Sequence, residues 1–569
     1  MAEYVSPIHT LPYFPDDLTL PQFLFEYKHP IRLHRDSETP WIIDSVSGKK
    51  ILEEELRERT WCLANGFSSR YSLGMSCTST DFPVTIWAAH RLGASVFALN
   101  PTFSVAELIP YLSDMKPAIL VVHPSALDAA RAAATHIGLP HSQIVLFDLS
   151  AVEADQPKDS PTATVEPPTF AEFKLKRGEG KSKTALYFPS SGTTGAPKMA
   201  ALPHSGIIAN IIQNACHDAG TDMSIPATER RFRPGDISCA GRHFGSRCRC
   251  QLTVPFSFTI LSYMTVVIMP QFDFLEYLSV IKRYKITHLS LVPSSLQLIC
   301  KHPSVKPANL ASVRVVFVGG ASVNLHFAEV MASLVPQAIV EQSYGMTEVG
   351  GLLTMPPLTR KVATKSAGYL LPGFTARVVK EDGSLAGRGE TGELYLSGPS
   401  LATHYVNNEK MSSEVFVDGW VRTGDEVYFD DNNEVHVVDR IKDFVKVRGA
   451  QVAPAELEAI LSTSPDVADC CVVPFPHETD GEVPKAYVVL SKDALERVHK
   501  DPAEGETIKA TLIKANIADN LSEAKRLSGG IEFIDAIPKT AAGKLLRRVL
   551  RAKTFGTTAQ SAAPAGNSG

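Results

Sequence analysis

Short runs of β-branched and apolar residues alternate with helix-like stretches along most of the chain. Residues 118–122, 287–292 and 313–318 are apolar runs of strand length, and residues 337–340 have the same character. Residues 273–284, by contrast, have a helical pattern. This alternation is typical of α/β layers built on largely parallel sheets. The pattern therefore predicts an α/β fold for most of the protein.

The pattern changes from about Phe374 onward. Glycine-marked turns separate short strands there, at residues 392–398 and 433–438. A smaller α+β unit follows, and the end of the chain is rich in Ala, Thr, Ser and Gly. We therefore expect a large N-terminal domain of layered α/β subdomains, a small α+β C-terminal domain and a disordered tail. The expected ranges are residues 1–439, 440–551 and 552–569.

One apolar stretch, residues 251–272, contains no charged side chain and has the length of a membrane-spanning helix. It also contains Pro255, Pro270 and several Ser and Thr residues. We interpret it as a buried helix that leads into a strand at residues 264–269. The sequence therefore predicts no membrane span.

Composition and charge limit which binding partners and which cellular compartment the sequence predicts. The formal net charge is −5, so there is no positive excess to attract nucleic acid. Nine scattered cysteines do not form the pattern of a disulfide framework and favour a reducing compartment. The first residues lack a secretory pattern, and the last ones form no peroxisomal signal. We expect a cytoplasmic protein, a monomer or weak homodimer, with no nucleic-acid partner.

The strongest chemical signal is Tyr187-Phe-Pro-Ser-Ser-Gly-Thr-Thr-Gly-Ala-Pro-Lys198. Glycines let successive backbone N–H groups turn towards an anion, hydroxyls add donors, and the lysine adds charge. The segment is not a Walker A loop, because its glycines and lysine have a different spacing. A Ser/Gly-rich run in isolation is usually a solvated turn. The closing Pro-Lys favours a polyphosphate-binding loop here.

Three segments further along the chain carry chemistry. In Gln342-Ser-Tyr-Gly-Met-Thr-Glu348, Thr347 could donate a hydrogen bond to a phosphate and Glu348 could hold Mg²⁺. Gly419-Trp-Val-Arg-Thr-Gly-Asp425 ends in an aspartate that can accept hydrogen bonds from ribose hydroxyls. Pro538-Lys-Thr-Ala-Ala-Gly-Lys544 presents one lysine on a loop of small residues. Taken singly, each has a plainer interpretation, namely a solvated acid, a linker or a surface lysine.

In this order and spacing, the segments resemble the adenylate-forming superfamily of acyl-CoA synthetases, firefly luciferases and non-ribosomal peptide adenylation domains. The resemblance covers about residues 18–551 and is greatest to 4-coumarate–CoA ligase-like acyl- and aryl-CoA ligases. Further motifs that carry it are Arg233-Pro-Gly-Asp, Thr265-Val-Val-Ile-Met-Pro and Gln451-Val-Ala-Pro-Ala-Glu-Leu-Glu458. It implies the adenylate-forming fold, in which the small C-terminal domain is a mobile lid on an AMP-binding domain.

The resemblance also implies which residues bind the nucleotide. The loop that closes over ATP would consist of Ser190, Ser191, Gly192, Thr193, Thr194, Gly195 and Lys198. The residues that would hold the adenine and border the acyl pocket are Gly320, Ala321, Gln342, Ser343, Tyr344, Gly345 and Met346. Thr347 would contact a phosphate, and Glu348 would bind Mg²⁺. The ribose would be held by Asp425 and Arg440.

The small domain would supply the remaining groups. Lys544 corresponds to the family's adenylation lysine, held near the carboxylate and the α-phosphate, and Lys442 falls at the hinge. The second half-reaction is the transfer of the acyl group from the adenylate to coenzyme A. The positions that correspond to the family's residues for this step are Lys446, Arg448, Gly449 and Gln451. The implied function is an ATP-dependent acid–CoA ligase that uses ATP, Mg²⁺ and coenzyme A on an aromatic or medium-chain carboxylic acid. Carrier-protein loading and luciferase-like oxidation remain alternatives.

One segment departs from the family. Between Asp236 and Phe256 the family has a buried strand that ends in an aromatic-plus-histidine run, but this chain has three arginines and three cysteines. Burying them unpaired would be costly. A zinc site of Cys239, His243, Cys248 and Cys250, an exposed divergent loop and a gene-model error could each explain the segment. We favour the gene-model error, because family-like sequence resumes by Phe256. A genuine segment would put the acid pocket in doubt and favour a nucleotide-binding pseudoenzyme.

Overall fold

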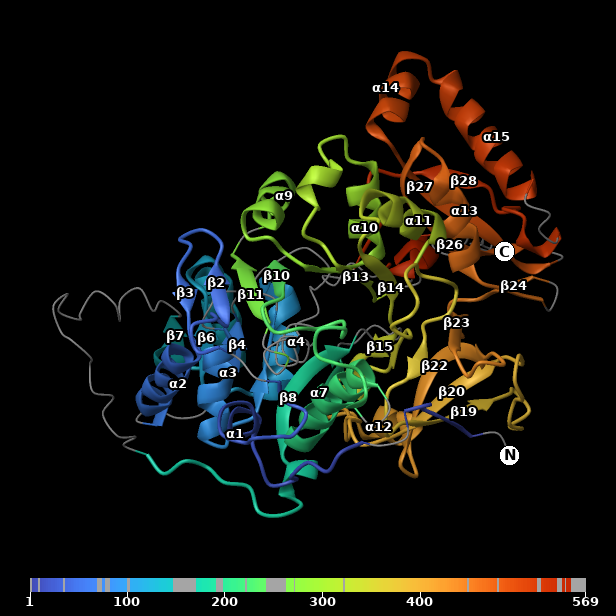
Figure 1. The fold of residues 1–569 in the computed structure, drawn as a ribbon. Coiled ribbons are helices and arrows are strands. Elements are labelled where there is room, and N and C mark those ends of the chain that lie inside the picture. The colour runs from blue at the N-terminus through green and yellow to red at the C-terminus, as the bar shows by residue number, and fades with distance from the viewer. Residues whose placement is uncertain are drawn as a thin grey trace, which may run out of the picture. The chain divides into compact units, whose positions relative to one another are not determined.

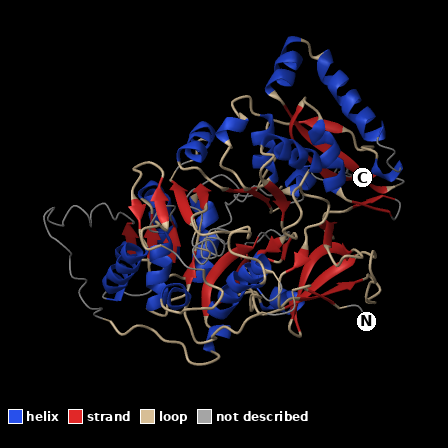
Figure 2. Ribbon diagram, viewed as in Figure 1, coloured by secondary structure: helices blue, strands red, loops and turns tan. Residues whose placement is uncertain are grey.

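Helices and strands alternate along much of the described chain, as the sequence pattern predicts (Figure 2). The fold is described from a computed structural model. It describes residues 3–8, 11–33, 36–68, 74–76, 82–99, 103–146, 170–190, 198–220, 223–241, 262, 264–270, 272–320, 323–447, 450–477, 480–518, 523–539, 545–547 and 549–553. The chain divides into a large unit and a small unit. The large unit comprises Met1–Arg377, Tyr395–Thr423 and Asp430–Val435, and the small unit comprises Val378–Leu394, Gly424–Phe429 and His436–Gly569.

A mostly parallel sheet organises the centre of the large unit. Its strand order is β14-β13-β12-β10-β11-β2-β3; neighbours from β14 to β2 are parallel, and β3 is antiparallel to β2. The strands are β2 (Ile42–Asp44), β3 (Lys50–Ile51), β10 (Ile237–Gly241), β11 (Thr265–Met269), β12 (His288–Leu291), β13 (Val315–Val318) and β14 (Ile339–Gln342). The strands predicted at 287–292, 313–318 and 337–340 are thus confirmed as β12, β13 and β14.

Helices α9 (Phe274–Arg283), α10 (Pro293–Lys301) and α11 (Leu325–Leu334) connect these strands and lie together beside the sheet (Figure 1). Asp273 caps α9, because its side chain accepts a hydrogen bond from the backbone N–H of Glu276. Apolar side chains such as Tyr277, Leu296 and Met331 share one buried core with the strands. The helix predicted at residues 273–284 is therefore confirmed as α9.

Two smaller sheets precede this part of the chain. One is parallel, with β4 (Gly74–Ser76), β6 (Leu120–Val122) and β7 (Ile144–Leu146), so the strand predicted at residues 118–122 is confirmed. The other contains β5 (Val96–Phe97), β8 (Thr184–Ser190) and β9 (Lys198–Pro203). The accompanying helices are α1 (Leu20–Phe25), α2 (Glu53–Ser68), α3 (Phe82–Arg91), α4 (Val105–Met115), α5 (Leu127–Ile137) and α7 (His204–Ala219). All residues of α7 are buried, including His204, Asn210 and Asp218, so its polar side chains need partners inside the protein.

Short antiparallel strands follow β14. They form the pairs β15 (Gly345–Met346) with β16 (Gly351–Leu352), and β17 (Thr354–Met355) with β18 (Tyr369–Leu370). A further sheet has the order β1-β19-β20-β22-β21, and β23 pairs with β22. Its strands are β1 (Tyr4–Val5), β19 (Thr375–Val379), β20 (Gly392–Ser397), β21 (Phe416–Val417), β22 (Trp420–Phe429) and β23 (Val435–Arg440), and α12 (Glu409–Val415) lies between β20 and β21 in the sequence. The strands predicted at 392–398 and 433–438 are confirmed as β20 and β23.

The C-terminal part of the small unit has its own sheet and core. The order is β25-β24-β27-β26, and β28 pairs with β27. The elements are β24 (Val445–Val447), β25 (Ala450–Val452), β26 (Val467–His477), β27 (Gly481–Leu490), β28 (Ile531–Phe533), α13 (Pro454–Thr463), α14 (Lys492–Lys500) and α15 (Ala503–Ala518). Leu457, Val472 and Leu512 belong to one buried core. Helical residues continue through Lys553, and residues 554–569 lie outside the described part.

Among the residues that the structure describes, no helix is long and apolar enough to cross a membrane. The strand predicted at residues 264–269 is confirmed as β11, which is fully buried. The helix predicted before it falls on residues 251–261, which lie outside the described residues.

Candidate active site

The predicted phosphate loop connects two antiparallel strands. Ser190, the last residue of β8, is the register partner of Lys198, the first residue of β9. The pairing brings the two ends of the loop together. The Lys198 side chain is buried, and its ammonium nitrogen lies 5.6 Å from the ring centroid of Tyr405. Predicted loop residues Ser191, Gly192, Thr193, Thr194 and Gly195 lie outside the described residues, as does the Ser190 side chain.

The predicted adenine segments lie at the carboxyl ends of adjacent parallel strands. Val318, the end of β13, pairs with Gln342, the end of β14, so Gly320 and Ser343 follow neighbouring strand ends. The backbone N–H of Ser343 donates to the carbonyl of Val318 at 3.1 Å. Ligands of open α/β sheets bind at this edge. Ala321 lies outside the described residues.

Hydrogen bonds fix the segment that follows β14. The amide of Gln342 donates to the carbonyls of Thr364 and Ser366, at 2.6 and 3.0 Å. The backbone N–H of Tyr344 donates to the hydroxyl of Thr354 at 3.1 Å. These hydrogen bonds orient Gln342 and the Tyr344 backbone through contacts within the protein itself.

Gly345 and Met346 then form β15, which turns through Thr347 and Glu348 into β16. A Cβ atom on Gly345 would lie 2.2 Å from the carbonyl oxygen of Gly351, so only glycine fits at this approach. The turn Thr347–Val349 is closed by Gly350, whose φ of 74° is in the left-handed region. The backbone therefore holds Thr347 and Glu348 next to each other on a tight turn.

Glu348 is buried and has a specific partner. Its Oε1 atom accepts a hydrogen bond from the hydroxyl of Tyr405 at 2.6 Å, and its backbone carbonyl accepts one from the N–H of Ala402 at 2.7 Å. Tyr405 was not among the residues predicted from the sequence. No local motif marks it, because it reaches Glu348 through tertiary pairing with β9. The structure thus adds Tyr405 to a group that contains Lys198 and Glu348.

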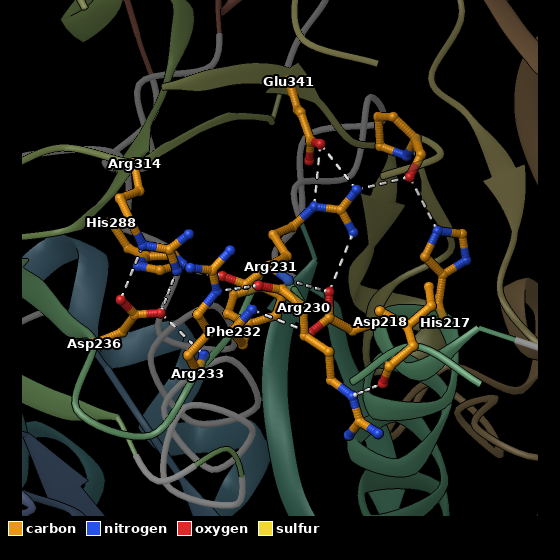
Figure 3. Close-up of polar contacts among 12 residues, drawn as sticks. His217, Asp218, Arg230, Arg231, Phe232, Arg233, Asp236, His288, Arg314 and Glu341 are labelled. Atoms are coloured by element: carbon orange, nitrogen blue, oxygen red, sulfur yellow. Dashed lines mark hydrogen bonds and ion pairs between the residues drawn. The ribbon is translucent and has the colours of Figure 1, made fainter. Parts of the chain in front are cut away.

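A buried cluster of charges adjoins β14 (Figure 3). Arg231 donates to Oε1 of Glu341 through Nε and Nη2, at 3.1 and 2.9 Å, and Nη2 also donates to the carbonyl of Pro356 at 2.9 Å. Asp218, near the end of α7, lies 3.6 Å from Nη1. Burial raises the pKa of Glu341 to about 7, although Arg231 acts in the opposite direction. The cluster links α7, β14 and the segment after β17, so it supports Gln342 at the end of β14.

In the small unit, Asp425 on β22 and Arg440 on β23 form an ion pair. Nε of Arg440 lies 3.2 Å from Oδ1 of Asp425, and Asp425 is 4% exposed. The structure thus brings the two predicted ribose residues together. The chain then turns at Lys442, whose carbonyl accepts a hydrogen bond from Arg551 at 3.4 Å. Lys442 therefore lies on the turn between β23 and β24.

Two of the residues predicted for the second half-reaction, Lys446 and Gln451, lie on paired strands. Lys446 on β24 is the register partner of Gln451 on β25, and the backbone N–H of Lys446 donates to Glu482 at 2.9 Å. Arg448 and Gly449, between these strands, lie outside the described residues, and so does the side chain of Gln451.

The base of the predicted lysine loop is a second antiparallel contact. Lys539 and Leu545 form a β-bridge, and the N–H of Leu546 donates to the carbonyl of Pro538 at 2.8 Å. Lys544 itself lies outside the described residues. The bridge joins the two ends of the loop to which Lys544 belongs in the sequence.

The segment that departs from the family begins as a regular strand. Cys239 pairs with Val267 in the middle of β10, and burial raises the pKa of its thiol to about 12. His243, Cys248 and Cys250 lie outside the described residues. Within the described residues, no three His, Cys, Asp or Glu side chains form a group that could hold a metal ion. The described part of this segment therefore continues the central sheet.

A parallel sheet with nucleotide-type segments at the ends of β13 and β14, a phosphate-type loop between β8 and β9, and a separate α+β unit are typical of an enzyme of the adenylate-forming fold. The family model of the AMP-binding enzymes matches residues 73–406, and that of the AMP-binding enzyme C-terminal domain matches residues 456–544. The chain belongs to the AMP-binding enzyme family. This confirms the predicted family.

Curated relatives and solved structures agree with this assignment. The acyl-CoA ligase frbB of Dothideomycetidae sp. (strain 11243) is 31% identical, covering 90% of this chain and 93% of that protein. 4-Coumarate–CoA ligase 2 of Oryza sativa subsp. japonica is 30% identical, covering 83% and 81%. The ATP-bound crystal structure of MatB from Rhodopseudomonas palustris superposes with a TM-score of 0.77 at 24% identity, covering 95% and 99%. The predicted fold class is thereby confirmed.

Proposed function

We propose that this chain is an ATP-dependent acid–CoA ligase, which activates a carboxylic acid as an acyl-adenylate and transfers the acyl group to coenzyme A. One observation carries the proposal. Lys198, which closes the phosphate loop, and Glu348, on the turn after β15, contact the same side chain, Tyr405. A cation and a carboxylate placed together in this way suit a metal-bound polyphosphate. The curated acyl-CoA ligases support the thioester product.

The first half-reaction requires positioning and charge stabilisation rather than a covalent enzyme intermediate. A carboxylate oxygen of the acid attacks the α-phosphorus of ATP, an acyl–oxygen–phosphorus linkage forms, and the bond to pyrophosphate breaks. Lys198 and Lys544 would offset negative charge on the phosphate oxygens, and Thr347 would donate a hydrogen bond to one of them. Asp425 would accept hydrogen bonds from the ribose hydroxyls, with Arg440 holding its carboxylate.

The residues present fit a magnesium ion that arrives with the nucleotide. Mg²⁺ keeps several water ligands and is commonly bound by one or two carboxylates together with substrate phosphates. Glu348 offers one such carboxylate, in a buried position and with a fixed orientation. Bound there, Mg²⁺ would neutralise phosphate charge. A cage of several protein carboxylates is not required.

For the second half-reaction, we assign the lid role to residues 440–551, which would turn about the segment 439–442. The hairpin that carries Lys446, Arg448, Gly449 and Gln451 would then face the adenylate. The thiolate of coenzyme A attacks the acyl carbon, the thioester forms, and AMP leaves with the electron pair of the broken bond. One site can thus serve both steps in sequence.

The acid is proposed to be aromatic or medium-chain. The residues expected near the pocket, Ala321, Met346, Val349 and Gly350, are small or apolar. Apolar lining with few polar groups favours an apolar acyl group. We also place the enzyme in the reducing cytoplasm, because the described cysteines, Cys62, Cys216, Cys239, Cys300, Cys470 and Cys471, are free thiols.

Mass spectrometry of the purified protein with Mg-ATP, coenzyme A and a pooled panel of aryl and aliphatic acids tests the proposal. We expect a new acyl-CoA that is lost in Lys544→Ala, whereas Lys446→Ala retains acyl-AMP formation and loses the thioester. Acyl-AMP without thioester in the wild type would point to a carrier-protein acceptor. ATP binding without either product would contradict the ligase function and favour a pseudoenzyme disabled at residues 239–250.

A further inference from the structure

Tyr405 lies on an extended segment that pairs with β9. The backbone N–H of Ala201 donates to the carbonyl of His404, and that of Thr403 donates to the carbonyl of Ala201, both at 2.9 Å. A β-bridge joins Ala200 to Tyr405 itself. The Tyr405 backbone is therefore fixed to the strand that begins with Lys198.

The side chain of Tyr405 is equally constrained. It is 6% exposed, and its ring packs edge-on against Phe416, with 5.3 Å between centroids. The backbone N–H of Tyr405 donates to the hydroxyl of Ser412 at 2.9 Å. A tyrosine held in this way presents its hydroxyl in one direction, and that direction is towards Glu348.

The hydroxyl of Tyr405 donates to Oε1 of Glu348 at 2.6 Å. A hydrogen bond to an ionised acceptor is about twice as strong as one between neutral groups, and 2.6 Å is the length expected for an O–H donor to a carboxylate. Glu348 is 4% exposed, so bulk water competes little for this oxygen. The bond fixes the rotation of the carboxylate, which the backbone contact from Ala402 leaves open.

The ring of Tyr405 faces Lys198, whose ammonium nitrogen is 5.6 Å from the ring centroid. This distance is within the range of a cation–π interaction. Tyr405 therefore contacts the phosphate-loop lysine with its ring and the carboxylate with its hydroxyl.

We propose that Tyr405 is a positioning residue for the divalent metal of the metal–nucleotide complex, because it orients the carboxylate of Glu348. The proposal rests on the proposed function, in which Glu348 binds that metal. Partners that orient a metal ligand typically contribute 10–100-fold to metal affinity. Tyr405→Phe removes the hydroxyl and keeps the ring, so it isolates this contribution from the contact with Lys198.

The experiment measures metal binding directly, without turnover. Mn²⁺ replaces Mg²⁺ as an electron paramagnetic resonance probe, and α,β-methylene-ATP, whose α–β linkage cannot release pyrophosphate, supplies the phosphates. The variants are Tyr405→Phe, Glu348→Gln and the double variant. Tyr284→Phe is the matched control, because its hydroxyl donates to the carbonyl of Ser45 at 3.2 Å, away from the predicted nucleotide segments.

We expect Tyr405→Phe to weaken Mn²⁺ binding to the nucleotide complex about tenfold or more, and Tyr284→Phe to leave it unchanged. The double variant should bind Mn²⁺ no more weakly than Glu348→Gln alone, because Tyr405 acts through Glu348. Two losses that multiply would instead indicate a general structural defect and overturn the proposal.

Wild-type Mn²⁺ affinity in Tyr405→Phe, with a clear loss in Glu348→Gln, would also overturn it while leaving the role of Glu348 intact. Wild-type affinity in Glu348→Gln would instead contradict the metal role of Glu348 in the proposed function. The two failures are thus distinguishable.

Discussion

Nη2 of Arg547 lies 2.8 and 2.7 Å from the two carboxylate oxygens of Glu458, so one nitrogen of the arginine bridges the whole carboxylate. Glu458 is on α13, and its Oε1 also accepts the N–H of Val472 at 2.8 Å. Arg547 lies three residues after Lys544 in the sequence, and its Nη1 lies 3.9 Å from Asp443 on the turn before β24. This pair therefore connects the end of the lysine loop to the core of the small unit.

Breaking this pair should destabilise the small unit. Arg547→Met leaves the carboxylate of Glu458 largely buried without its cation, which we expect to cost about 3 kcal/mol. All four tryptophans, at positions 41, 61, 87 and 420, are in the large unit, so hydrogen exchange of peptides from β26 and β27 is the suitable measurement. We expect faster exchange there in Arg547→Met.

Glu458→Met should have a similar effect, and the Arg547→Met/Glu458→Met double variant should exchange more slowly than either single variant, because neither member of this pair is left without the other. Unchanged exchange in both single variants would show that the pair does not stabilise this unit.

The buried cluster in the large unit predicts unequal effects for the two partners of one ion pair (Figure 3). Arg231→Met removes the cation next to Asp218 and Glu341, and we expect a loss of about 4 kcal/mol in the free energy of unfolding. Glu341→Gln should cost much less at pH 6, because a pKa of about 7 means that the native carboxyl is already mostly protonated. Urea unfolding followed by tryptophan fluorescence measures both.

The loss in Arg231→Met should also grow between pH 6 and pH 8. Burial raises the pKa of both Asp218 and Glu341, so without Arg231 their ionisation becomes more unfavourable as the pH rises. Equal losses in Arg231→Met and Glu341→Gln at pH 6 would contradict this account.

Buried histidines predict acid lability of the large unit. Burial lowers the pKa values of His90, His217 and His288 to about 4. In the unfolded chain these histidines therefore bind protons as the pH falls below about 6.5, whereas in the folded protein the three side chains stay neutral down to about pH 4. The stabilisation is fully present above pH 6.5 and is lost as the pH falls towards 4. Each histidine should cost about 1.4 kcal/mol between pH 7.5 and 5.5.

His217→Gln can keep a donor to the carbonyl of Pro356, which His217 contacts at 3.0 Å. We expect it to reduce the difference in unfolding free energy between pH 7.5 and pH 5.5 by about 1 kcal/mol. The exposed His326 provides the control, since His326→Gln should leave that difference unchanged. If His217→Gln leaves the difference in unfolding free energy between the two pH values unchanged, protonation of His217 is not a cause of the acid lability.

Two glycine substitutions should have opposite effects. Gly345→Ala would place a Cβ atom 2.2 Å from a backbone oxygen of β16, so the hairpin that carries Thr347 and Glu348 must shift. We expect a lower melting temperature and a higher KM for ATP in pyrophosphate exchange.

Gly66→Ala, in helix α2, meets nothing within 4 Å and should raise stability by about 0.5 kcal/mol without changing the KM. A wild-type KM for ATP in Gly345→Ala would contradict the assignment of this hairpin to the nucleotide.

The sequence predicted the parts of the site that are local. Lys198, Asp425 and Glu348 stand in short runs whose glycines and hydroxyls already have the chemistry of a nucleotide site, and the strand-like runs that became β12, β13 and β14 could be read from their apolar pattern. The spacing of these runs was enough to recognise the family, because the order of the segments is preserved along nearly the whole chain.

The residues that hold those segments in place could not be predicted in this way. Tyr405 is 57 positions from Glu348, and Arg231 is 110 positions from Glu341. No periodicity connects residues so far apart, and neither a single tyrosine nor a single arginine marks its partner in the sequence. Tyr405 comes within reach of Glu348 when β9 pairs with the segment around Tyr405. Arg231 comes within reach of Glu341 when α7 packs against the segments after β14. The sequence by itself thus determined the family and the chemistry of each segment. The tertiary structure decided which side chains orient the groups in those segments, because a buried charged group can interact only with the partners that packing brings within reach.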